Sequence, residues 1–186
     1  MVRDERGLAL STDSPAAAQK FDRAVEHYLK YHTDTMSLVG SAIAEDRQFV
    51  MAHVLKGYLL LSAANPAHAP QIAAAVAAAS ANAAAITPRE RHHLAALTAW
   101  ADGNLNQSFA LWQQILRDAP TDLLAFRICD TTWFRHGQTA KIREQADAIA
   151  VRVGMNFSSD LERLTYAYKL LFGRAPVSEE RIVHGV

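Results

Sequence analysis

The chain has 186 residues, of which half are hydrophobic and a fifth are charged. These values are those of one ordinary globular domain, and they exclude a wholly disordered chain and a collagen-like fibre. Nineteen basic residues balance nineteen acidic ones, so the formal net charge is zero and we expect no nucleic-acid partner. The single cysteine, Cys129, excludes an internal disulfide and a multi-cysteine zinc site.

The opening residues, 1–13, lack the continuous apolar run of a secretory signal. Residues 57–88 contain no Asp, Glu, Lys or Arg, but Asn65, Pro66 and Pro70 interrupt them and alanine dominates their second half. A spanning helix needs about 20 strongly apolar residues without such interruption. We therefore expect no membrane span, and we expect the cytoplasm as the compartment.

Apolar residues recur at steps of three and four along the chain, which predicts helices and no strand. Ser14 before Pro15 and Thr87 before Pro88 are typical of helix starts, with a capping side chain followed by a proline. After a first helix that opens at Pro15, the predicted helices are 35–44, 48–63, 70–86, 88–102, 106–118, 122–136, one ending near 154, 159–173 and a short turn from 178.

A repeat is the strongest pattern in the chain. Gly103 and Gly137 are 34 residues apart, the period of tetratricopeptide repeats. Gly57 fits the small position within an earlier first helix, where Ala96 stands in the later one. The second half of such a repeat has a hairpin glycine, a small residue, an aromatic, an apolar residue and a closing proline, here Gly103, Ser108, Trp112, Ile115 and Pro120. We expect a positive φ at Gly103, in the turn between two helices.

The predicted fold is therefore all-α, a tetratricopeptide-like array of antiparallel helical hairpins, or α-solenoid. We divide the chain into an N-terminal extension (1–13), a repeat domain (14–155) and a divergent C-terminal helical tail (156–186). Three stretches, residues 8–34, 49–57 and 87–138, resemble the tetratricopeptide repeat protein 38 family in order and spacing. The likeness covers about residues 7–153, and it implies a helical-repeat fold and no established enzyme activity.

The histidines do not predict a metal site. His92 and His93 are adjacent, so on a helix they point about 100° apart. His27 and His32 are five residues apart, which is a poor spacing for one helix face. Cys129 lies in an apolar helix without an activating base. We expect no metal, no cofactor and no catalytic residue.

Recognition by a concave helical surface is the remaining interpretation, because the first helices of stacked hairpins line a groove. Rings beside arginines suit an extended peptide or an acidic terminus. The expected groove residues are Tyr58, His93, Leu97, Trp100, Arg127, Thr131 and Arg135, with Phe134 beside them. The open alternative is that Trp100 and Phe134 pack between repeats.

The leading hypothesis is a non-catalytic protein-interaction scaffold that binds an unidentified peptide or partner helix in this groove. The alternative is an accessory or cofactor-binding domain of an enzyme whose active half is missing from this short chain. A pocket of converging polar groups with shifted pKa values would favour the alternative. The predicted helix 159–172 is apolar on more than half of its circumference. We therefore expect that Tyr166, Leu170 and Phe172 either make a homodimer contact or form the most aggregation-prone patch of the protein.

Overall fold

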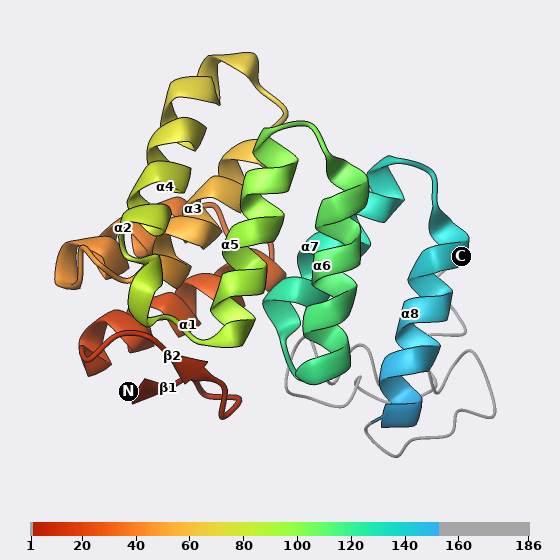
Figure 1. Ribbon diagram of the computed structural model, residues 1–186, viewed down its shortest axis with the longest axis horizontal. Coiled ribbons are helices and arrows are strands. Elements are labelled where there is room, and N and C mark those ends of the chain that lie inside the picture. Colours follow the sequence, from red (N-terminus) through yellow and green to blue (C-terminus); the bar gives the residue numbers. More distant parts are fainter. Residues whose placement is uncertain (1, 153–186) are drawn as a thin grey trace.

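A computed structural model describes residues 2–152 of the chain (Figure 1). Over these residues the chain is all-α, with one short pair of strands, β1 (Val2–Arg3) and β2 (Ala9–Leu10), that the sequence did not predict. The α-helices are α1 (Pro15–Leu29), α2 (Thr35–Glu45), α3 (Val50–Ser62), α4 (Ala69–Ala81), α5 (Pro88–Ala101), α6 (Leu105–Asp118), α7 (Leu123–Arg135) and α8 (Thr139–Arg152). Two single 3₁₀ turns, η1 (Pro66–His68) and η2 (Ala83–Ala85), flank α4. The predicted helices 159–173 and 178 onward lie outside the described residues.

The helix starts follow the capping chemistry of the sequence. The Ser14 side chain accepts a hydrogen bond from the Ala17 amide at the start of α1. Thr87 and Glu90 form a reciprocal capping box at the start of α5. Both predicted starts are confirmed, because each side chain satisfies an amide that has no partner within the helix.

The opening segment, residues 2–13, packs against the helices. Leu10 is fully buried. The Ser11 amide donates to Glu90 Oε1 at 2.9 Å, and the Arg89 guanidinium donates to the Ala9 carbonyl at 3.1 Å. The segment folds into the antiparallel β1–β2 pair, and these two hydrogen bonds hold it beside the start of α5.

Four turns share one backbone feature, a residue with positive φ just after a helix end. These residues are Tyr31, Ala64, Gly103 and Gly137, at intervals of 33, 39 and 34 residues. The φ of Gly103 is +79°, so the sequence prediction for this glycine is confirmed. The sequence showed only two of the four turns, because Tyr31 and Ala64 take the place of glycine in the others.

Each of these turns joins two helices that pack on each other: α1 with α2, α3 with α4, α5 with α6, and α7 with α8. Between the pairs, α3 packs on α5, and α6 packs on α7. The predicted small positions lie at these contacts. A side chain added at Gly57 would come within 2.6 Å of Leu97, and Ser108 Oγ donates to the Ala96 carbonyl at 3.0 Å.

Among the described residues, no helix is long and apolar enough to cross a membrane.

Candidate functional site

The seven predicted groove residues divide by helix: four lie on α3 and α5, and three lie on α7, where Arg127 is buried and Arg135 is exposed. Tyr58, His93 and Leu97 are fully buried, so the prediction that they line an open groove is wrong. The error is one of helix face. These apolar and aromatic positions belong to the stripes through which α3 and α5 pack on each other and on α6, and a helix directs its apolar stripe to the core.

Two of the buried residues form a polar network with α6. The Tyr58 hydroxyl donates to the His93 carbonyl at 2.9 Å and accepts from Trp112 Nε1 at 2.9 Å. Trp100 is half-buried, and its ring packs edge-on against Trp112, with the ring centroids 5.5 Å apart. The Trp100 ring also lies 6.2 Å from that of Tyr58 on α3, so it packs between hairpins, as the alternative interpretation held for this residue but not for the exposed Phe134.

Asp122 joins this network to α7. Its Oδ2 lies 3.0 Å from His93 Nε2 and accepts from the Arg89 guanidinium at 2.7 Å. Its Oδ1 accepts from the Ala125 amide and caps α7. Burial alone would raise the pKa of Asp122, but the charge and hydrogen bond of His93 and the charge of Arg89 outweigh it and hold the pKa below its ordinary value.

A second buried aspartate, Asp22 on α1, lies across a small cavity from Asp122. Burial, followed by the charge of Asp4, raises the pKa of Asp22 to about 6, and its Oδ1 has no hydrogen-bond partner. Polar groups with shifted pKa values do converge here. The cavity, however, has a volume of only about 10 Å³, which is at most the room that one water needs. It is not a substrate-sized pocket.

The α7 residues lie on one face of the helix, where Thr131 follows Arg127 by four residues, and Phe134 and Arg135 follow Thr131 by three and four. The Phe134 ring is 69% exposed. The Arg127 guanidinium lies 4.4 Å from the centre of the Tyr31 ring, which is itself 77% exposed. We call these five residues the α7 face. Tyr31 was missed in the sequence, because it belongs to a turn and to no helical stripe.

Polar atoms on the α7 face are incompletely paired. Arg127 is buried to nine-tenths, yet its Nε has no hydrogen-bond partner, and neither has Thr131 Oγ1. Arg135 donates to the Ser62 carbonyl at the end of α3 and is exposed. The face therefore combines two exposed rings with one exposed guanidinium group, that of Arg135, and one buried group, that of Arg127, which lies 4.0 Å from the Asp130 carboxylate.

Cys129 on α7 is fully buried, and its thiol donates to Gln145 Oε1 at 3.3 Å. Burial raises the pKa of this thiol well above its ordinary value. A thiol held in its neutral form is a poor nucleophile, which agrees with the expectation from the sequence.

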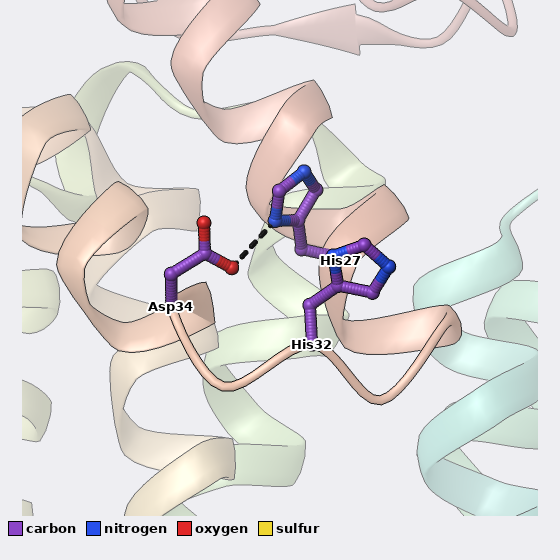
Figure 2. A group of neighbouring side chains, drawn as sticks. All are labelled: His27, His32 and Asp34. Atoms are coloured by element: carbon purple, nitrogen blue, oxygen red, sulfur yellow. Dashed lines mark hydrogen bonds and ion pairs between the residues drawn. The ribbon is translucent and has the colours of Figure 1, made fainter.

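One group in the described part of the chain has donor atoms close enough to share a metal ion, namely His27, His32 and Asp34 (Figure 2). His27 Nδ1 lies 2.7 Å from Asp34 Oδ1, and the two imidazole centroids are 4.5 Å apart. The hydrogen bond with His27 holds the pKa of Asp34 below its ordinary value. Sequence reasoning missed this group because it placed both histidines on one helix, whereas α1 ends at Leu29.

No protein-family model matches the chain, and no solved structure matches it.

Proposed function

We propose that this chain is a non-catalytic interaction scaffold that holds an acidic peptide segment of a partner protein on the α7 face. The observation that carries the proposal is the exposure of Tyr31 and Phe134, at 77% and 69%, beside Arg127 and Arg135. Large rings that a fold leaves in water are typical of interaction sites. Arginine forks bind carboxylates in two-point geometry, so the pairing favours an acidic and partly apolar ligand.

We further propose that the described helices are a tetratricopeptide-like array related to the tetratricopeptide repeat protein 38 family. Four helix pairs with a positive-φ residue in each turn, at intervals of 33, 39 and 34 residues, support the array. In this proposal the binding surface differs from the expected groove, because Tyr58, His93 and Leu97 are occupied between hairpins. The cytoplasm stays the proposed compartment, since the only cysteine is a free thiol.

Fluorescence anisotropy with a labelled peptide tests the proposed function. The probe is a hexapeptide of alternating Glu and Leu with a free C-terminal carboxylate, compared with a Lys–Leu peptide of the same length. We expect the full chain to bind the acidic probe and not the basic one, with weaker binding at high salt.

Variants of the α7 face test whether the peptide binds there. Two variants are compared: Phe134→Ala alone, and a double variant that carries Arg127→Ala and Arg135→Ala. Each of the two should weaken binding of the acidic probe about tenfold or more. Met36→Ala and Arg91→Ala are the matched controls, because Met36 is an exposed apolar side chain on α2 and Arg91 an exposed arginine on α5. Equal binding by the α7-face variants and the controls would overturn the proposal.

A further inference from the structure

The turn between α1 and α2 carries a side-chain group that the interaction surface does not use. His27, His32 and Asp34 each offer one donor atom, and these atoms lie within 4.8 Å of one another (Figure 2). The geometry points to a binding site for a divalent transition-metal ion, with Zn²⁺ as the reference metal, formed by these three side chains.

The backbone of the turn brings the two histidines together. The His32 amide donates to the His27 carbonyl at 2.9 Å, and the Tyr31 amide donates to the Tyr28 carbonyl at 3.3 Å. This pair of bonds, with Tyr31 at positive φ, is the Schellman motif, which places the two residues of its outer bond in contact. The imidazoles of His27 and His32 are therefore held close before any ion binds.

The turn itself does not require histidines. The same outer bond joins Ala99 to Asn104 after α5, and Trp133 to Gln138 after α7. Neither of those pairs offers two metal-binding nitrogens. The pair of imidazoles is thus a property of the residues in the α1–α2 turn and not of the Schellman motif.

Asp34 is the third member of the group, and its side chain does not play the capping role that is usual at its position. It occupies the N-cap of α2, where an aspartate normally accepts a backbone hydrogen bond, but its side chain makes no capping bond. Its carboxylate lies instead against His27. At the starts of α6 and α7, Asn104 and Asp122 do cap their helices.

The donor set selects the class of metal. Two imidazoles with one carboxylate suit Zn²⁺, Cu²⁺ or Ni²⁺, whereas Ca²⁺ and Mg²⁺ prefer oxygen ligands alone. Zinc bonds of about 2.0–2.2 Å in a tetrahedron separate the ligand atoms by about 3.3 Å. The observed spread of up to 4.8 Å therefore closes with small rotations, for which His32 and Asp34 are free because both are exposed.

Metal binding also determines which ring nitrogen of His27 carries the proton, and it leaves one coordination position of the ion open. In the metal-free chain His27 Nδ1 carries a proton and donates it to the Asp34 carboxylate. Coordination through Nδ1 therefore requires His27 to carry its proton on Nε2 instead, which frees the Nδ1 lone pair for the ion. Three protein ligands leave a fourth position for water or for an external donor.

Calorimetric titration of the metal-free, untagged full chain with ZnCl₂ tests the site. We expect one equivalent of Zn²⁺ to bind, and no binding of Mg²⁺. His32→Ala and Asp34→Asn should each weaken the affinity for Zn²⁺ at least tenfold, while circular dichroism stays that of the wild type, because both side chains are exposed. Anomalous scattering at the zinc edge should place the ion within bonding distance of His27, His32 and Asp34.

The matched control is His92→Ala, which removes a histidine of α5 outside the group. This control should bind Zn²⁺ like the wild type. The inference is overturned by a wild type that does not bind Zn²⁺ at millimolar concentration. It is overturned equally by His32→Ala and Asp34→Asn variants that bind like the wild type, or by a loss of binding in His92→Ala of the same size.

Discussion

Two aspartate–histidine pairs share one feature, an aspartate at a helix N-cap, and differ in their surroundings. Asp122 with His93 and Asp34 with His27 both place an N-cap aspartate beside a histidine of a preceding helix. The first pair is buried, with Arg89 completing it. The second is open to solvent, with the Asp34 side chain 56% exposed. A buried pair with all partners in place acts in folding, whereas an exposed pair beside His32 has donor atoms for a ligand.

The turn after α1, which holds the exposed pair, also differs from the turn after α5. After α5 the positive-φ position holds Gly103, which adopts that conformation without steric cost, and Asn104 then caps α6. After α1 the same position holds Tyr31, and Asp34 leaves α2 without a side-chain cap. A turn that departs from two local rules at once is where a functional constraint is expected.

Removing the charge of the buried pair should have the largest effect. Asp122→Asn keeps the size of the side chain but leaves the Arg89 guanidinium without its counter-ion inside the fold. We expect a loss of about 3–5 kcal/mol in the free energy of unfolding, measured by urea denaturation followed by circular dichroism. Adding Arg89→Met should recover part of this loss. An unchanged denaturation midpoint in Asp122→Asn would contradict a structural role for the Asp122–His93 pair.

Asp22 should give a smaller effect of opposite sign. The fold raises the pKa of Asp22 from 3.8 to about 6, so the native state binds more protons than the unfolded chain between these pH values. Stability therefore falls as the pH rises from about 4 to 6 and stays reduced above this range. Asp22→Asn should stabilise the protein at pH 7 by up to about 3 kcal/mol and flatten the pH profile of the midpoint. A variant with an unaltered profile would contradict this assignment.

The helices were predictable because their signals are local. Serine or threonine before proline set the starts of α1 and α5, and Gly103 set the turn between α5 and α6. The turn at Tyr31 was not predictable, because a tyrosine at positive φ has no signature in the sequence. The β1–β2 pair was missed for a related reason, since two-residue strands carry no alternating pattern.

The site was predicted only in part, since burial depends on how the helices pack. Arg127 and Arg135 were expected on a binding surface, and they lie with the exposed Phe134 on one face of α7. Tyr58 and His93 were assigned to the same surface, yet they meet Trp112 and Asp122 in the interior. Sequence spacing gives the residues that share a helix face, but not which face the neighbouring hairpins cover.

The two turns can be compared directly by replacing the positive-φ residue in each. Gly103→Val should lower stability by about 2 kcal/mol, because a branched side chain is strained at a φ of +79° even though the added Cβ meets no atom within 4 Å. Tyr31→Gly should change stability far less, because it relieves a similar strain but loses the contact with Arg127 and adds freedom to the unfolded chain. Thermal denaturation of both variants measures the difference. An equal loss in the two would show that the turns are equivalent.

The smallest effect is expected at the exposed pair in the absence of metal. Asp34 caps no amide of α2 with its side chain, and water screens its interaction with His27. Asp34→Asn should therefore leave the thermal midpoint of the metal-free protein unchanged. With Zn²⁺ present, the midpoint of the wild type should rise and that of the variant should not, because an ion that binds only the folded state stabilises it. The contrary outcome is a metal-free Asp34→Asn variant that loses as much stability as Asp122→Asn does. Asp34 would then act in the folding of the turn, and its contact with His27 would be explained without a metal ion.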